Sequence, residues 1–189
     1  MYKQELRELY KAKRKALSDK ERLRLDDLIL LRFQQFDYSD IQTLLSYWPV
    51  ARMAEPNTLP FSSYLRHLIP GLRIAYPVTN TVTNEMKAVA ITEETIYHTT
   101  PLGLTEPKEG EELAGTEIDL VLVPMLACDM DGFRVGYGKG YYDRFLVKCR
   151  ENIIKIGFSY FEPVHQITDR DQFDVPLTYC ITPWQIYEF

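Results

Sequence analysis

The stretch that most constrains this chain is residues 123–146, where a strand, a glycine-rich loop and a helix follow one another. Four of the nine glycines fall within nine residues: Gly132, Gly136, Gly138 and Gly140. Glycine adopts positive φ without steric cost, so this loop can turn successive N–H groups toward one point. A helix over residues 141–150 would add unpaired N–H donors and the positive end of its dipole. The stretch therefore predicts a site for phosphate groups.

The same stretch carries the charges that a nucleotide site needs. The cations are Arg134, Lys139 and Arg144, and the carboxylates are Asp129, Asp131 and Asp143. Lysine and arginine neutralise phosphate oxygens, and magnesium prefers hard oxygen ligands. This combination suits a magnesium–nucleotide complex.

Three common loop motifs are excluded by spacing. A Walker A loop would need glycine where Phe133 stands and serine or threonine where Gly140 stands. The dinucleotide fingerprint needs its third glycine three positions after its second, whereas Gly136, Gly138 and Gly140 follow one another at intervals of two. Asp129 begins a run similar to a calcium loop, but the glutamate at the twelfth position is missing. A tight turn without a ligand remains the alternative.

Residues 132–143, Gly-Phe-Arg-Val-Gly-Tyr-Gly-Lys-Gly-Tyr-Tyr-Asp, resemble the signature of the 5-formyltetrahydrofolate cyclo-ligases, also called methenyltetrahydrofolate synthetases. A dozen consecutive positions agree in type and order. The resemblance extends to the basic opening at residues 3–7 and to residues 173–177. Residues 78–116 show nothing specific to that family.

The resemblance implies a nucleotide and metal site. ATP would contact Lys3, Gln4, Glu5, Leu6, Arg7, Arg134, Val135, Gly136, Tyr137, Gly138, Lys139, Gly140, Tyr141 and Tyr142. Lys139 and Arg134 would be the catalytic residues, and Asp143 and Asp174 would hold Mg²⁺. Among three neighbouring aspartates, the apolar run 175–177 selects Asp174. Asp169 and Asp171 are then expected to be solvated loop charges.

The resemblance also implies a folate pocket. Its residues would be Val50, Glu55, Tyr137, Gly138, Lys139, Gly140 and Tyr141. Glu55 and Thr58 fit the family's glutamate with threonine three residues on. The chain has several residues over 49–53 that shorter relatives lack. The match of Val50 to the family's pattern therefore depends on where these extra residues are placed. Other aromatic side chains could flank a flat pterin, but Tyr47, Trp48 and Phe61 are interpreted as core residues.

Composition indicates one domain over residues 1–189. The chain is 46% hydrophobic and 13% aromatic, enough for a sizeable core. No apolar run approaches the roughly 20 residues of a membrane span, and the charged N-terminus lacks a signal-peptide core. We expect a cytoplasmic protein without a membrane partner.

Three cysteines without CxxC spacing suggest buried thiols rather than a disulfide or zinc site.

The net charge of −5 hides a basic N-terminus, where residues 1–25 carry nine lysines or arginines against four acids. Such an arm could bind nucleic acid, but its apolar residues recur at helical spacing, so one face should pack on the domain. We expect the protein to be a monomer and to have no nucleic-acid partner.

Ser18 and Glu21 form a capping box that begins a second helix, and this helix ends near Phe36.

Apolar runs predict strands over residues 43–48, 72–76, 86–91, 118–123 and 153–158, with a helix over 59–69 and an edge strand within 178–189. Strands alternating with helices predict an α/β fold: a single-domain three-layer sandwich, Rossmann-like, with a largely parallel sheet flanked by helices. Ligands of such sheets bind at the carboxyl ends of the strands.

The activity implied by the resemblance is the conversion of 5-formyltetrahydrofolate to 5,10-methenyltetrahydrofolate, with Mg²⁺ as cofactor and ATP cleaved to ADP and phosphate. The partners would be ATP and a folate with or without a polyglutamate tail. Two alternatives remain open: another phosphate-handling enzyme, such as a kinase or sugar-phosphate isomerase, and a non-catalytic nucleotide- or folate-binding paralogue. Because the chain keeps both cations and carboxylates, the sequence favours an enzyme.

Overall fold

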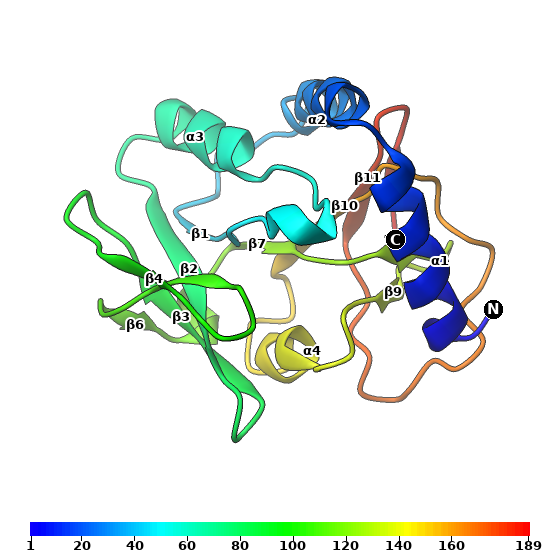
Figure 1. Cartoon of the computed structure of the whole chain (residues 1–189). Helices are drawn as coiled ribbons and strands as arrows, with labels where there is room; N and C mark the ends of the chain where they lie inside the picture. Colours follow the sequence, from blue (N-terminus) through cyan, green and yellow to red (C-terminus); the bar gives the residue numbers. More distant parts are fainter.

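The computed structural model describes all 189 residues and contains an eight-stranded mixed sheet with helices packed on both faces (Figure 1). The helices are α1 (Lys3–Ala16), α2 (Asp19–Phe33), α3 (Leu59–Leu68) and α4 (Tyr141–Leu146), with short 3-10 helices η1 (Ala51–Met53) and η2 (Gly115–Glu117). The main sheet contains β1 (Thr43–Leu45), β2 (Arg73–Asn80), β3 (Glu85–Ala90), β6 (Glu112–Leu113), β7 (Leu120–Val123), β10 (Ile154–Phe158), β11 (Tyr179–Ile181) and β12 (Ile186–Glu188). Two small sheets pair β4 (Tyr97–Thr99) with β5 (Thr105–Pro107) and β8 (Ala127–Cys128) with β9 (Arg134–Val135).

The strand order of the main sheet is β12-β11-β10-β7-β1-β2-β3-β6. The central strands from β11 to β2 are all parallel, whereas β12 pairs antiparallel with β11, β3 with β2, and β6 with β3. The predicted largely parallel α/β sheet is confirmed. All the parallel strands end at the same edge of the sheet, where such folds bind ligands.

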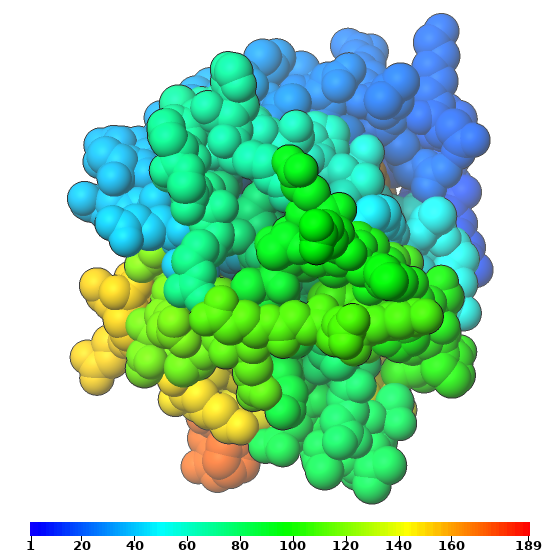
Figure 2. All heavy atoms as spheres, turned by 90° about the vertical axis from the view of Figure 1, so that its left-hand side faces the viewer, coloured from blue at the N-terminus to red at the C-terminus, as the bar shows by residue number.

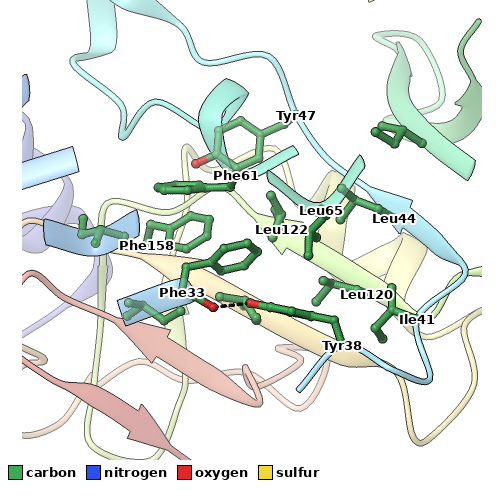
Figure 3. Packing of buried hydrophobic residues seen from close by; sticks show 14 of the residues in the cluster. Phe33, Tyr38, Ile41, Leu44, Tyr47, Phe61, Leu65, Leu120, Leu122 and Phe158 are labelled. Atoms are coloured by element: carbon green, nitrogen blue, oxygen red, sulfur yellow. Dashed lines mark hydrogen bonds between the residues drawn. The ribbon is translucent and has the colours of Figure 1, made fainter. Parts of the chain in front are cut away.

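Two apolar layers separate the sheet from its helices. Successive strand residues point to opposite faces, so Leu44 packs on one side and Leu45 on the other. On the first face, α2 and α3 contribute Phe33 and Phe61 (Figure 3). On the second face, α4 contributes Phe145. Each such side chain stabilises the fold by about 1.5–3 kcal/mol when it leaves water, which accounts for the three layers.

Helix α1 lies beside the sheet and contacts β8, β9 and η1 (Figure 1). Its apolar face buries Leu6 and Tyr10 against Val135 and Ile167, so the predicted packing of the basic arm is confirmed. The Lys3 backbone N–H donates to Asp169 Oδ1 at 2.7 Å, which fastens the first turn. This packing places Arg7 of α1 against the glycine-rich loop.

Several boundaries differ from those predicted. The Ser18 capping box starts α2 as expected, with the Ser18 N–H donating to Glu21 at 2.8 Å. Helix α4 is shorter than residues 141–150, because after Leu146 the backbone tightens into i→i−3 hydrogen bonds such as Cys149 N–H to Leu146 O. Strand β1 ends at Leu45, so residues 46–48 of the predicted strand lie outside it.

No helix has the length and apolar content to span a membrane.

The three cysteines are free thiols, as expected. Cys128 and Cys180 are buried, and Cys149 is half-buried. A hydrogen bond from the Cys128 thiol to the neighbouring Cys180, together with burial, holds the pKa of Cys128 well above its usual value. None of them lines the cavity described below.

Candidate active site

A cavity of about 460 Å³ opens at the carboxyl ends of the parallel strands. It is bounded by α1, the segment after β1, strand β2, the β4–β5 hairpin, the glycine-rich loop and the start of α4. Its volume falls within the range of small-molecule sites. Residues from both termini and from the middle of the chain meet there, so this cavity is the candidate active site.

One end of the cavity is rich in cations. Lys3, Arg7 and Lys11 come from α1, and Lys139 comes from the loop. Arg7 Nε donates to the Gly136 carbonyl at 3.0 Å, which ties the helix to the loop. Lys139 is exposed and forms no ion pair or side-chain hydrogen bond within the protein, so its ammonium group is free to reach a ligand. This end can neutralise phosphates.

The loop has the backbone geometry that its glycines predict. Gly138 and Gly140 have φ values of +90° and +68°, a region that strains other residues. A Cβ added at Gly136 would meet no atom within 4 Å, so a ligand can approach that backbone closely. Helix α4 has only six residues, so its dipole is weaker than the predicted longer helix would supply.

The two arginines of this region are engaged in holding the loop. Arg134 is almost buried; one of its amino groups donates to Asp143 Oδ1 at 2.8 Å and the other to the Val175 carbonyl. Arg134 nevertheless contributes to the cavity wall. Arg144 donates to the Lys139 carbonyl and to the Asn84 carbonyl and does not line the cavity, so the expectation that it supplies a cation to a nucleotide site is not met. Its hydrogen bonds stabilise the loop instead.

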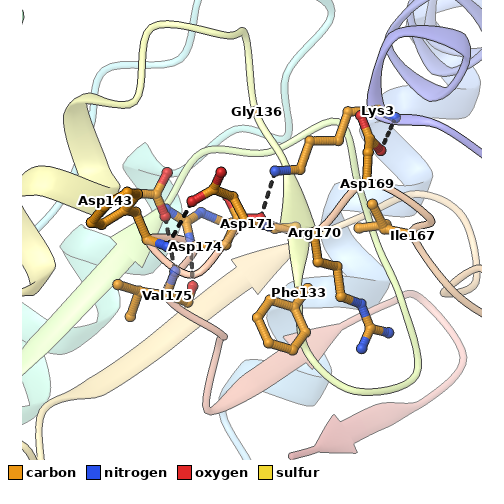
Figure 4. A network of polar contacts seen from close by, with 12 residues as sticks. Lys3, Phe133, Gly136, Asp143, Ile167, Asp169, Arg170, Asp171, Asp174 and Val175 are labelled. Atoms are coloured by element: carbon orange, nitrogen blue, oxygen red, sulfur yellow. Dashed lines mark hydrogen bonds and ion pairs between the residues drawn. The ribbon is translucent and has the colours of Figure 1, made fainter.

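Asp143 and Asp174 lie together in the cavity wall (Figure 4). The Val175 N–H donates to Asp143 Oδ1 at 3.1 Å, and Lys3 Nζ lies 2.5 Å from Asp174 Oδ2. The second oxygen of each carboxylate has no protein partner. No cluster of three or more His, Cys, Asp or Glu side chains forms a cage for a metal. Two carboxylates with free oxygens fit Mg²⁺, which usually keeps several waters and bridges substrate phosphates.

The remaining acids near the loop have structural roles. Asp129 is fully buried and accepts hydrogen bonds from Arg170 and from the Ile167 N–H, and Asp131 pairs with Arg170 as well. The expectation that these two supply oxygens to a nucleotide site is not met, because neither lines the cavity. Asp169 is an exposed loop residue, as expected, and its carboxylate also caps the first turn of α1.

Four of the residues predicted to contact ATP lie outside the cavity wall. Leu6 and Val135 are buried in the small core beneath α1. Glu5 caps the N-terminus of α1 by accepting from the Tyr2 N–H, and Gln4 donates to Glu8 on the outer face. Within the predicted segment 3–7, only Lys3 and Arg7 line the cavity. The helical period explains this, because positions i and i+4 share a face.

The other end of the cavity is aromatic. Tyr47 and Trp48 pack against the core, as predicted, but they also line the cavity. Phe61 lies wholly within the core. Tyr141 and Tyr142 also line the cavity, and both hydroxyls are buried without a partner in the protein. Buried hydroxyls are normally hydrogen-bonded, so these two indicate polar groups on a ligand or on ordered water.

A hydrogen-bonded chain of three residues runs from the buried Arg14 to the aromatic end. The Arg14 guanidinium, fully buried, donates to the Tyr137 hydroxyl at 3.0 Å, and that hydroxyl hydrogen-bonds the Glu55 carboxylate. The Val50 N–H also donates to Glu55, at 2.7 Å. Burial raises the pKa of Glu55 above its usual value, and the Tyr137 and Val50 hydrogen bonds and the Arg14 charge offset part of that rise. The network opposes protonation of a carboxylate that lines the cavity.

Replacing Tyr137 by phenylalanine is expected to shift the acid side of the pH–rate profile. The change removes a hydrogen bond that lowers the pKa of Glu55, so the pKa rises and Glu55 protonates at higher pH. The acid limb of kcat/KM for the cavity's ligand should therefore move to higher pH. Tyr160→Phe is the matched control, because its buried hydroxyl contacts Asp26 and not the Glu55 carboxylate. If the acid limbs of the wild type, Tyr137→Phe and Tyr160→Phe superimpose, this role of Tyr137 is contradicted.

Sequence reasoning missed Arg14, which is buried behind the cavity wall and holds Tyr137, and one group of residues that line the cavity itself. Arg14 falls four residues after Tyr10 and eight after Leu6, on the buried stripe of α1, and a cation on that stripe is a signal that could have identified it. Pro77, Thr79 and the β4–β5 residues Leu102, Leu104, Thr105 and Glu106 also line the cavity. No motif marks them, because only the tertiary fold of the hairpin brings them there.

Comparison with known proteins gives consistent matches. The 5-formyltetrahydrofolate cyclo-ligase family model matches residues 1–183. A 5-formyltetrahydrofolate cyclo-ligase of Mycoplasma pneumoniae is 30% identical over 164 residues, covering 85% of this chain and 86% of the relative. The mouse enzyme of the same name is 38% identical over 73 residues, 35% of this chain and 36% of the relative.

Solved structures agree with the sequence matches. The NMR structure of Aquifex aeolicus 5,10-methenyltetrahydrofolate synthetase superposes with a TM-score of 0.80 at 28% identity, covering 100% of this chain and 93% of that one. The 5,10-methenyltetrahydrofolate synthetase of Mycoplasma pneumoniae gives a TM-score of 0.77 at 26% identity, covering 97% and 99%. With the signature forming the cavity's loop, this chain belongs to the 5-formyltetrahydrofolate cyclo-ligase family.

Proposed function

We propose that the protein converts 5-formyltetrahydrofolate to 5,10-methenyltetrahydrofolate, with ATP cleaved to ADP and phosphate and with Mg²⁺ required. The observation that carries the proposal is the lining of this cavity, which joins a cation-rich glycine loop to aromatic and acidic residues. A nucleotide's phosphates fit the first end and a folate's flat rings fit the second. We further propose that it acts as a cytoplasmic monomer.

The chemistry requires activation of a poor electrophile. The formyl group on N5 is an amide, and its oxygen is a poor leaving group. In the proposed reaction the formyl oxygen attacks the γ-phosphorus and ADP departs. N10 of the same molecule then attacks the formyl carbon, loses its proton and expels phosphate. Ring closure is intramolecular, so the protein needs to hold a near-attack geometry rather than supply a nucleophile.

The residues of the cation-rich end would stabilise the charge that moves during transfer. Lys139, with its free ammonium group, would neutralise the transferred phosphoryl group, and Arg7 and Lys3 would hold the nucleotide phosphates. Arg134 would contribute positive charge from the wall while it orients Asp143. Preorganised charge of this kind is the main catalytic device of phosphoryl transfer.

Asp143 and Asp174 would hold Mg²⁺ through their free oxygens, and the ion would neutralise phosphate charge and align the γ-phosphoryl group. At the other end, Tyr137, Tyr141 and Val50 would flank the folate, and Glu55 would accept a hydrogen bond from it.

The direct test is the appearance of the methenyl chromophore when the purified protein receives 5-formyltetrahydrofolate, ATP and Mg²⁺. Omission of ATP, and separately chelation of Mg²⁺, should each abolish the signal. A folded protein that binds ATP or folate without forming the chromophore would be a binding paralogue. Phosphoryl transfer to another acceptor would instead favour a kinase.

Glu55→Gln is expected to raise the KM for 5-formyltetrahydrofolate more than the KM for ATP. The change keeps the size of the side chain but removes the negative charge, and charge-assisted hydrogen bonds are about twice as strong as neutral ones. The Val50 N–H and the Tyr137 hydroxyl can still donate to the amide oxygen, so the local fold should persist. A larger change in the ATP constant would show that residues 50–55 do not form the folate end.

A further inference from the structure

Glu106 is a buried acid in the cavity wall that neither the sequence motifs nor the proposed mechanism uses. It lies on β5 with 2% of its surface exposed. The Thr79 N–H and hydroxyl both donate to its Oε1, at 3.1 and 2.6 Å. Thr79 belongs to β2, so this carboxylate joins the β4–β5 hairpin to the main sheet at the edge of the cavity.

The Glu106 carboxylate lacks the partners that a buried acid normally has. It takes part in no ion pair, and its second oxygen, Oε2, accepts no hydrogen bond from the protein. A carboxylate has about four acceptor sites, and Thr79 occupies those of Oε1 alone. A buried charge without a cation is costly, so the cavity is built to receive donors from a ligand at this point. Glu55 differs, because Val50, Tyr137 and Arg14 already compensate it.

The position of Glu106 selects which part of a ligand it meets. It comes from the β4–β5 side of the cavity, whereas the phosphate-binding cations of α1 come from the opposite side (Figure 1). Figure 2 shows the segment between β3 and β7, in green, lying across the face on the hairpin side. The unpaired Tyr142 hydroxyl belongs to the same cavity. A ligand whose phosphate-accepting group points to Lys139 would thus turn another edge toward Glu106.

We propose that Glu106 recognises the 2-amino-4-oxopyrimidine edge of the pterin by accepting hydrogen bonds at Oε2 from the 2-amino group and a neighbouring ring N–H. This inference rests on the proposed function and names the contact that orients its folate substrate. The two donor nitrogens are both bonded to C2 of the planar ring and point to the same side, so a carboxylate oxygen with two free acceptor sites can meet them together. Thr79 fixes the plane of the carboxylate, so Glu106 would be a specificity-determining residue.

The test compares 5-formyltetrahydrofolate with an analogue in which methyl replaces the 2-amino group. Equilibrium binding is measured by calorimetry without ATP, on the wild type, Glu106→Gln and Glu109→Gln. Glu109 is the matched control, an exposed acid three residues on that has no side-chain partner. The wild type should bind the analogue about 10- to 100-fold more weakly, the range for a hydrogen bond to a charged group. Glu106→Gln should weaken binding of the parent compound about tenfold and discriminate far less between the two compounds; Glu109→Gln should match the wild type.

Three results would overturn the proposal. If the wild type binds both compounds equally, no group of the protein recognises the amino edge. This comparison uses the wild type alone, so it does not depend on whether a variant folds. If Glu106→Gln behaves like Glu109→Gln, Glu106 only ties the hairpin to β2. If Glu55→Gln, rather than Glu106→Gln, abolishes the discrimination, the pterin edge meets Glu55. Binding without turnover by the wild type would refute the proposed reaction but not this contact, so the two failures are distinguishable.

Discussion

Lys139→Met is expected to lower kcat by about 10²- to 10³-fold with little change in the thermal unfolding midpoint. Removal of one preorganised charge that acts on the transition state typically costs about 3–4 kcal/mol. Lys139 is exposed and its ammonium group binds nothing within the protein, so the substitution removes no native contact of that group. The flanking glycines keep the loop's positive φ values.

The measurement is kcat under saturating ATP and folate, together with thermal unfolding. Lys108→Met is the control, because Lys108 is also exposed and unpaired but lies outside the cavity. Unchanged turnover in a folded Lys139→Met protein would remove Lys139 from the mechanism.

Asp174→Asn is expected to raise the Mg²⁺ concentration needed for half-maximal activity by at least about tenfold and to depress kcat, whereas Asp171→Asn should do neither. Asp174 lines the cavity beside Asp143 and keeps one oxygen free, whereas Asp171 is exposed outside it and accepts from the Phe173 N–H. With only two candidate carboxylates, the loss of one charge weakens the site markedly.

Asp174 also pairs with Lys3, and a third variant separates this role from metal binding. Lys3→Met removes the ion pair but leaves both carboxylate oxygens. It should raise the KM for ATP without raising the Mg²⁺ requirement. If Asp171→Asn raises the requirement and Asp174→Asn does not, the metal ligand is Asp171 and the predicted position of the C-terminal carboxylate is wrong.

The parts of the site that the sequence predicted are those built from contiguous residues. The glycine loop is specified locally, because positive φ at Gly138 and Gly140 follows from residue type, and its cation follows at Lys139. The parallel sheet and its two apolar faces were also predictable, since strand period and helix spacing determine which side chains face inward.

What the sequence could not supply depends on contacts between distant segments. Arg134 reads as a free phosphate cation until the fold places the Val175 carbonyl and Asp143 against it. Glu106 lies in a stretch without a motif, and only the pairing of the hairpin with Thr79 turns it into a cavity wall. The segment 3–7 was predicted as a unit, but the helix separates Lys3 and Arg7 from Leu6, which faces the core.

The central claim is that ATP activates the formyl oxygen, and the fate of that oxygen tests it most directly. The protein would be given 5-formyltetrahydrofolate labelled with ¹⁸O in the formyl group, with unlabelled ATP and Mg²⁺, and the inorganic phosphate would be analysed by mass spectrometry. One ¹⁸O per phosphate, in step with methenyl formation, is the predicted result. Unlabelled phosphate formed alongside the methenyl product would contradict the account, because the formyl oxygen would then have left by another route.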